Sequence, residues 1–427
     1  MRTPTALGRR AVLTGGTALV LTLTAAPATA AAPPKAPRGS LVLIGGGLKD
    51  DNTQVYGEII NRAGGPKARI GVITAASVPA SQDPDANDPA NCNNSACNGA
   101  HYANLFRKHG AADAQWIPID LDHIANADAT AVVDQVNSMT GFFFGGGDQY
   151  RYVTTLLHGA GHTDSRVLAA IRAKLAAGAV IAGSSAGAQI ASGADMVTGG
   201  DSYQALRDGS SPGYFEDPSR LGYLPEGGFG FLRSGLIDTH TGTSGREGRA
   251  LRLAADTGHD RVYALEENTA LVVDNPGTTR EALSVLGPQG VAVLDLRHAR
   301  TRQAGGWSLT GARYTYLTDG DRYDAHHRLA VPAPAKRPLV PRGNQPVAPN
   351  NDAFHSAANA HGSPYSLRST ARELVQTRAQ HTATATTFES GPRFTVTLTK
   401  SPGFTSWTGE AGRAQSIISL GIAISPH

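Results

Sequence analysis

Short apolar runs that end in glycine or polar residues recur along the first three quarters of the chain. The clearest is residues 40–44, Ser-Leu-Val-Leu-Ile, followed by three glycines. Such runs predict buried strands, and they return at residues 69–75, 115–119, 141–144, 179–182, 235–237, 261–265 and 291–296. Helices are predicted between several of them, at residues 54–62, 101–109, 129–138 and 165–177. The alternation predicts an α/β fold with a mostly parallel sheet covered by helices on both faces.

Composition changes along the chain divide it further. Residues 201–230 are rich in Gly, Pro and aromatic residues, which predicts a long loop over the carboxyl ends of the strands, where substrate sites often form. Residues 326–365 are dense in Pro, Ala and Asn and predict a linker or extended arm. Residues favouring β-structure at 382–387, 393–399 and 416–424 predict a small β-rich C-terminal module over 366–427. The α/β domain itself is then expected over residues 40–325.

The N-terminus has the features of an export signal. Arg9 and Arg10 precede the weakly apolar run 11–26, and Ala28-Thr29-Ala30 follows. This order predicts a signal peptide over residues 1–30, then a Pro/Ala linker over residues 31–39. The paired arginines favour the twin-arginine route, and the general secretory route remains open. The expected location is secreted, extracellular.

The charge balance and the cysteine content limit which binding partners and metals can be expected. The 427 residues include 38 Lys and Arg against 35 Asp and Glu, and removal of Arg2, Arg9 and Arg10 with the signal leaves 35 of each. A neutral mature chain gives no reason to expect binding to nucleic acid or to a membrane. Cys92 and Cys97, the only cysteines, predict a local disulfide in an exported chain. A zinc site would need a companion Cys/His pair, so no metal or cofactor is expected.

The sequence around Ser185 predicts a nucleophile elbow. An apolar strand runs into Gly183-Ser184-Ser185-Ala186-Gly187, and a helix begins directly after it. The small neighbours allow a sharp turn that exposes Oγ of Ser185 and brings the amide of Ala186 near a developing oxyanion. A five-residue pattern in a Gly-rich chain is also compatible with a purely structural turn, so the partners of Ser185 matter.

Three further segments place polar residues just after apolar strands. They are Gly145-Gly146-Gly147-Asp148-Gln149-Tyr150-Arg151, then Asp238-Thr239-His240 followed by Arg246 and Arg249, and Glu266-Glu267-Asn268-Thr269-Ala270. Together with the elbow, these segments resemble the motifs of the cyanophycinase and dipeptidase E family of serine peptidases. The resemblance covers about residues 41–324 and ends at Gly320-Asp321-Arg322-Tyr323-Asp324. It implies a sheet similar to that of the class I glutamine amidotransferases, a flavodoxin-like arrangement.

The resemblance also implies roles for particular residues. Ser185 would attack an amide carbonyl, and His240 would act first as base and then as acid. Glu267 is expected to orient the imidazole, with Asp201 and Asp238 as rivals. The oxyanion hole would use the amides of Ala186 and Gly147. Substrate-contacting side chains are expected at Gln149, Arg151, Asp238, Arg246 and Arg249, although the arginines are also compatible with surface helix charges.

Two departures from the family pattern limit what is implied about substrate. The family's Gln before the histidine is Thr239 here, and its first trailing Arg is Ser244. The leading hypothesis is hydrolysis of cyanophycin, a poly-aspartate carrying arginines, to β-Asp-Arg dipeptides. A peptidase for α-aspartyl or other acidic peptides is the enzymatic alternative, and a non-catalytic peptide- or glycan-binding protein on the same fold is the third. A homodimer is left open by the sequence.

Overall fold

The computed structural model describes residues 39–409 and 414–427. The signal peptide expected at residues 1–30 and nearly all of the expected linker lie outside the described residues. In the described ranges, no helix is long and apolar enough to cross a membrane.

The first sheet carries five of the eight predicted strands, and the predicted runs at 235–237, 261–265 and 291–296 lie in a second sheet. The order of the first sheet is β19-β18-β14-β13-β1-β7-β4-β2-β3, and the five strands from β1 to β3 are mutually parallel. These five are β1 (Ser40–Ile44), β7 (Val180–Ser184), β4 (Gly141–Phe144), β2 (Arg69–Ile73) and β3 (Asp113–Trp116). Four antiparallel strands extend the β1 edge: β13 (Ala270–Asp274), β14 (Ala282–Leu286), β18 (Arg322–Asp324) and β19 (Leu329–Val331). The predicted α/β class is therefore confirmed.

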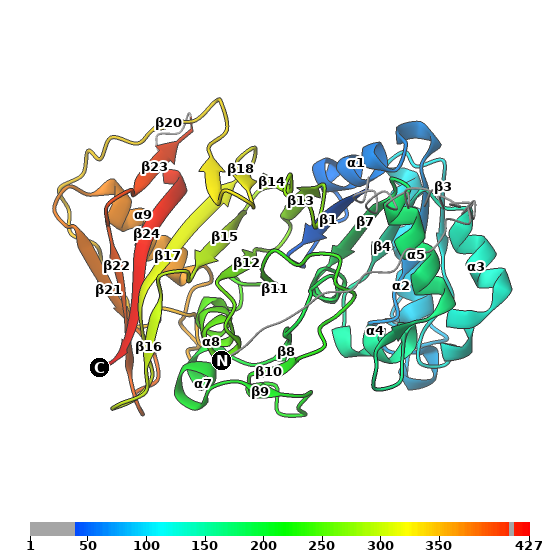
Figure 1. Cartoon of the computed structure of the whole chain (residues 1–427), viewed down its shortest axis with the longest axis horizontal. Coiled ribbons are helices and arrows are strands. Elements are labelled where there is room, and N and C mark those ends of the chain that lie inside the picture. Colours follow the sequence, from blue (N-terminus) through cyan, green and yellow to red (C-terminus); the bar gives the residue numbers. More distant parts are fainter. Residues whose placement is uncertain (1–38, 410–413) are drawn as a thin grey trace, which may run out of the picture. The chain divides into compact units, whose positions relative to one another are not determined.

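Alternate residues of β1 enter two different cores, as expected for a strand buried on both faces. Val42 and Ile44 pack with α1 (Thr53–Arg62) and α2 (Ser95–Lys108). Leu41 and Leu43 belong to the core that contains α3 (Thr130–Asn137), α4 (Gln149–Leu156) and α5 (Arg166–Ala176). Figure 1 shows these helices around the parallel strands.

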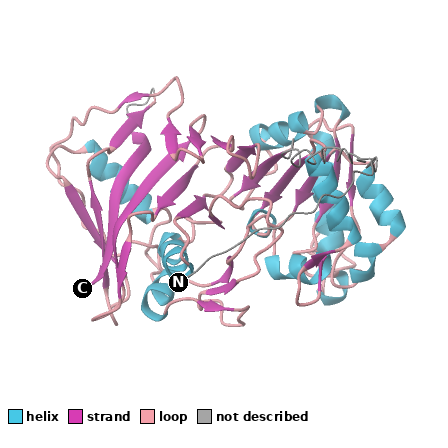
Figure 2. Ribbon diagram, viewed as in Figure 1, coloured by secondary structure: helices cyan, strands magenta, loops and turns pink. Residues whose placement is uncertain are grey.

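A second sheet joins the α/β region to the C-terminal strands. Its order is β11-β12-β15-β17-β24-β22-β21, and β24 pairs with β17 along most of its length (Figure 1). The strands are β11 (Leu236–Asp238), β12 (Arg261–Leu265), β15 (Gly290–Asp295), β17 (Ser308–Thr318), β24 (Ala414–Pro426), β22 (Phe394–Thr399) and β21 (Thr382–Thr386). The β-rich C-terminal region exists as predicted, but its strands continue the sheet of the α/β region. Figure 2 shows this strand-rich part.

The segment expected to be a linker or arm, residues 326–365, is held by the rest of the protein. It contributes β19 and β20 (Arg337–Pro338), and at its end the amide of Tyr365 donates to the carbonyl of Gly242 at 2.7 Å. Helix α9 (Ser366–Gln376) follows and buries Leu367, Leu374 and Val375. Its Pro-, Ala- and Asn-rich composition predicted a linker or arm, but composition carries no information about what a segment packs against.

The expected loop at residues 201–230 contains short regular elements. These are α7 (Ser202–Asp208), β9 (Ser211–Pro212) and β10 (Gly222–Leu224), which pairs with β8 (Met196–Gly199). The remaining elements are α6 (Ala186–Gln189), α8 (Glu247–Thr257), β5 (Leu157–His158), β6 (Thr163–Asp164), β16 (Arg300–Arg302), β23 (Thr405–Thr408) and the 3-10 helices η1 (Gly65–Lys67), η2 (Ala80–Gln82) and η3 (Ile124–Asp128).

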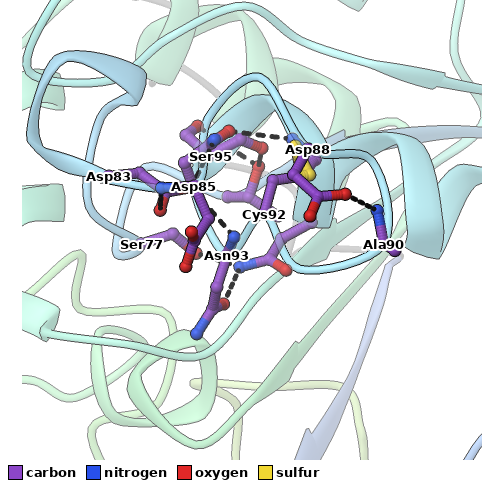
Figure 3. Close-up of a disulfide and its surroundings, with 12 residues drawn as sticks. Ser77, Asp83, Asp85, Asp88, Ala90, Cys92, Asn93 and Ser95 are labelled. Carbon is purple, nitrogen blue, oxygen red and sulfur yellow. Dashed lines mark hydrogen bonds between the residues drawn. A yellow bond between two sulfur atoms is a disulfide. The ribbon is translucent and has the colours of Figure 1, made fainter.

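The predicted disulfide between Cys92 and Cys97 is present, with a Cα–Cα distance of 6.2 Å (Figure 3). It ties a polar loop to the first turn of α2, and this helix begins several residues earlier than predicted. Asn94 caps that helix by accepting from the amide of Cys97 at 3.0 Å, and Asp83 holds Asn94 in turn at 2.8 Å. The bridge thus shapes this loop locally.

Candidate active site

Ser185 lies on a sharp turn between a strand and a helix. Strand β7 ends at Ser184 and α6 begins at Ala186, and Ser185 between them has φ 56° and ψ −118°. A side chain on either neighbouring glycine would not fit, because a Cβ on Gly183 would lie 2.0 Å from the carbonyl oxygen of Gly187, and a Cβ on Gly187 would lie 2.0 Å from that of Phe144. This left-handed backbone at a serine is strained, and strain of this kind collects at functional sites.

A chain of hydrogen bonds links Ser185 to His240 and Glu267. Oγ of Ser185 lies 2.8 Å from Nε2 of His240, and Nδ1 of the same ring lies 2.6 Å from Oε1 of Glu267. With Nδ1 donating to the carboxylate, Nε2 is left as the acceptor for the serine hydroxyl. Glu267, rather than Asp201 or Asp238, therefore occupies the orienting position.

The turn after β1 holds the last two members of this chain together. The amide of His240 donates to Gly45 O at 2.7 Å, and that of Asn268 donates to Gly46 O at 2.8 Å. Gly46 has φ +102°, and a Cβ there would lie 2.2 Å from Cε1 of His240. The glycine lets the backbone pass directly against the imidazole. From the sequence, these glycines predicted only a tight loop, because the His240 ring that Gly46 contacts lies far away in the sequence.

The environment of His240 favours the neutral imidazole. Burial lowers the pKa of His240, and the positive charges of Arg246 and Arg249 act in the same direction. The hydrogen bond to Glu267 opposes this but does not outweigh it. A neutral imidazole is the form that can accept a proton from Ser185.

Free backbone donors border Ser185. Within the described part of the chain, the amides of Gly146, Gly147 and Ala186 make no hydrogen bond to a protein acceptor. Gly146 lies beside the nucleophile, since a Cβ on it would be 3.4 Å from Cβ of Ser185. Gly147 instead packs on Ala76, whose carbonyl oxygen would be 2.2 Å from an added Cβ. The sequence had suggested Ala186 and Gly147; the geometry adds Gly146 to this set.

Asp238 and Arg249, two of the residues expected to contact substrate, bind each other. The guanidinium of Arg249 binds the carboxylate of Asp238 in a bidentate pair, with distances of 2.8 and 2.6 Å. Both side chains are buried, and Arg249 also donates to the carbonyl of Gly200 at 2.7 Å. The structure therefore places two residues that were expected to contact substrate, Asp238 and Arg249, in a buried pair with each other. Breaking such a buried pair would leave an uncompensated charge, so the pair instead fixes α8 against β11.

Arg246 differs from Arg249 in having no carboxylate partner. Across the two described ranges, no acidic oxygen lies within 4.0 Å of its guanidinium, which donates only to the carbonyl of Thr239 at 3.1 Å. Burial and the charge of Arg249 lower the pKa of Arg246 to about 10, so it stays cationic at neutral pH. An unpaired, partly buried guanidinium beside His240 is suited to bind an anionic group.

Gln149 and Arg151 lie at the start of α4, which Asp148 caps by accepting from the amide of Tyr150 at 2.8 Å. The side-chain amide of Gln149 donates to the carbonyl of Val197 at 2.9 Å, and Arg151 donates to Ala76 at 2.7 Å. Gln149 thus contacts strand β8, and Arg151 holds the Ala76 backbone that packs against Gly147; both side chains have donor capacity left for a ligand.

Comparison with known proteins gives the family. Residues 41–280 match the model of Peptidase family S51, and the chain belongs to this family of peptidases. The chain is also similar to the crystal structure of a peptidase from an acI-B1 Actinobacterium, with 18% identity, a TM-score of 0.44, and coverage of 68% of this chain and 98% of that one. A putative Peptidase E protein from Listeria monocytogenes EGD-e is similar at 12% identity and a TM-score of 0.34, over 55% of this chain and 94% of that one.

Proposed function

We propose that the protein is an exported serine peptidase that cleaves aspartyl-rich substrates, and that cyanophycin, degraded to β-Asp-Arg dipeptides, is the substrate. The observation that carries the proposal is the chain from Ser185 through His240 to Glu267, with hydrogen bonds of 2.8 and 2.6 Å. The strained turn at Ser185 and the free amides beside it support the same reading. A disulfide is compatible with export.

The chemistry follows from these positions. As Oγ of Ser185 attacks the amide carbon, its proton passes to Nε2 of His240, and Glu267 stabilises the resulting imidazolium. The oxyanion would be held by backbone amides of Ala186 and of the Gly146–Gly147 segment. His240 then protonates the leaving amine as the C–N bond breaks. Water attacks the acyl-enzyme ester with His240 again as base, which restores the Ser185 hydroxyl.

A peptidase for other acidic peptides is the second candidate. One observation favours it: Arg249 is committed to Asp238, so only Arg246 of the two matched arginines has no carboxylate partner among the described residues. With Ser244 in place of another arginine, the enzyme would bind a poly-aspartate backbone less tightly. A non-catalytic binding protein is less well supported, because such a protein has no use for a strained serine hydrogen-bonded to a neutral histidine.

Incubation of the purified protein with cyanophycin, followed by mass analysis of the products, tests the proposal. Release of β-Asp-Arg is expected, and Ser185→Ala should lower kcat by roughly 10³-fold or more while the protein stays folded. Ser184→Ala, one residue earlier, is the matched control and should retain most of the activity. Cleavage of α-aspartyl peptides but not of cyanophycin would select the second candidate. Turnover by Ser185→Ala at more than a tenth of the parent rate would end the serine mechanism.

A further inference from the structure

A cavity of about 360 Å³ lies next to the loop that follows His240. One wall comes from the α/β region and includes Asp201, Ser244 and Arg246. The opposite wall comes from the C-terminal region and includes His355, Phe388 and Glu389. The second wall lies outside residues 41–280, which match the family model.

The two walls of the cavity are in direct backbone contact at Gly245 and Phe354. A Cβ on Gly245, which has φ +56°, would lie 1.4 Å from the carbonyl oxygen of Phe354, so only glycine allows this approach. The hydroxyl of Thr243 donates to Tyr365 Oη at 3.1 Å, and the amide of Tyr365 donates to Gly242 at 2.7 Å. The C-terminal wall is thus attached to the same loop that positions His240, and the cavity is built into the fold.

Unlike charges face this cavity without forming ion pairs. In residues 39–409 and 414–427, Arg246 has no carboxylate within 4.0 Å, and Glu389 has no cation within that distance. Glu389 is half-buried and accepts from the hydroxyl of Ser356, which leaves further acceptor capacity on its carboxylate. The ring of Phe388, 39% exposed, offers an apolar face beside it. A guanidinium can stack on such a face while it binds a carboxylate.

Arg246 and Ser244 line the cavity and also adjoin His240 of the candidate active site. The amide of Ser244 donates to the carbonyl of His240 at 2.8 Å, and the charge of Arg246 acts on the imidazole of His240. A substrate unit bound between Arg246 and Glu389 would therefore lie beside the loop that carries His240. The arrangement fits a unit that carries both a carboxylate and a cationic side chain.

We propose that this cavity is the subsite for a cationic side chain of the substrate, with Glu389 as its acceptor, Phe388 as its stacking face and Arg246 binding a carboxylate of the same unit. The proposal rests on the proposed function, because it names what the substrate carries beside the scissile bond. The C-terminal region is then a specificity-determining part of the enzyme. The chemistry suits a guanidinium best, and an ammonium is the alternative source of the same charge.

The test compares two-unit aspartyl substrates that carry arginine, lysine or citrulline, the last being a neutral analogue of arginine. The parent enzyme should prefer arginine over citrulline by about 10-fold or more in kcat/KM, the size of one charge-assisted hydrogen bond. Glu389→Gln should lose that preference by slowing the arginine substrate alone. Glu373→Gln is the matched control, because Glu373 also accepts a hydrogen bond in the C-terminal region, from the amide of Ala348 at 3.1 Å, and does not line the cavity.

The outcomes separate this proposal from the proposed function. Hydrolysis of arginine and citrulline substrates at equal rates, or an equal loss on both in Glu389→Gln, overturns the subsite and leaves the peptidase assignment intact. Absence of hydrolysis of every aspartyl substrate overturns the proposed function. In that case calorimetric titration of β-Asp-Arg and β-Asp-citrulline into the parent and into Glu389→Gln decides the subsite. The proposal predicts that the substitution weakens the binding of β-Asp-Arg and leaves the weaker binding of β-Asp-citrulline unchanged. Equal kcat/KM values for the lysine and arginine substrates would show that the enzyme recognises only the positive charge, which contradicts the stacking role of Phe388.

Discussion

Glu266 and Arg368, 102 positions apart in the sequence, form a buried ion pair with an Oε2–Nη1 distance of 2.6 Å. Tyr316 donates to the same carboxylate at 2.6 Å, and the ring of Tyr365 lies 4.0 Å from the Arg368 guanidinium carbon. Glu266 directly precedes Glu267, the carboxylate that contacts His240. Helix α9 of the C-terminal region is therefore coupled through this pair to the backbone that carries the third member of the candidate site.

Arg368→Met should destabilise the protein by about 3 to 5 kcal/mol, because it leaves Glu266 buried without its cation. It should also lower kcat, since the backbone at Glu267 loses its anchor. Chemical unfolding measures the first effect. Arg297→Met is the control, because Arg297 pairs with Asp295 at a more exposed position and should cost less than about 1 kcal/mol. Equal losses in the two variants would show that the buried pair has no special role.

The pH dependence of kcat/KM should report His240. Burial lowers the pKa of His240 below its ordinary value of about 6.5, and neutral His240 is the active form, so kcat/KM should rise with pH through a midpoint below about 6.5. Glu267→Gln removes the hydrogen bond that raises this pKa, so the midpoint should fall further and the rate should drop by roughly 10²-fold or more. A midpoint that does not move in Glu267→Gln would assign the titration to another group.

Arg246→Ala should act selectively on acidic substrates. Loss of one charge-assisted pair should lower kcat/KM by roughly 10- to 100-fold on an aspartyl-arginine peptide, and much less on its amidated analogue. Removal of this positive charge should also raise the pKa of His240, moving the midpoint of the pH profile upward. Arg207→Ala, which breaks an exposed pair with Asp208, is the control. Equal effects on the acid and its amide would show that Arg246 does not bind the carboxylate.

Glu247, at the start of α8, should make stability fall as pH rises. Burial raises its pKa to about 8, whereas a glutamate in the unfolded chain titrates near 4.3. The folded state therefore holds a proton that the unfolded state releases, and the stabilisation present below about pH 4.3 is lost progressively up to about pH 8. Glu247→Gln cannot ionise, so its stability relative to the parent should increase between pH 5 and 8. Unfolding free energies at three pH values measure this, and a constant difference would contradict it.

Much of the α/β region was readable from the sequence because its signals are local. Five apolar runs became parallel strands, and the Gly183-to-Gly187 pattern became a strained turn, since small residues at these positions are required by contacts within a few residues. The disulfide followed from two cysteines in one loop. Motif order also indicated His240 and Glu267 as partners of Ser185, although a choice among three carboxylates remained.

The sequence by itself therefore determined the fold class, the elbow and the candidate nucleophile. Tertiary structure decided which groups are free and which are paired. Asp238 and Arg249 were expected to contact substrate, but the geometry makes them partners of each other, and Arg246 has no carboxylate partner among the described residues. The role of Gly46 beside His240, the attachment of α9 to Glu266 and the cavity wall at Glu389 depend on segments more than a hundred residues apart. Periodicity and spacing report only near neighbours, so contacts of this kind are decided by how the sheets and their connections pack.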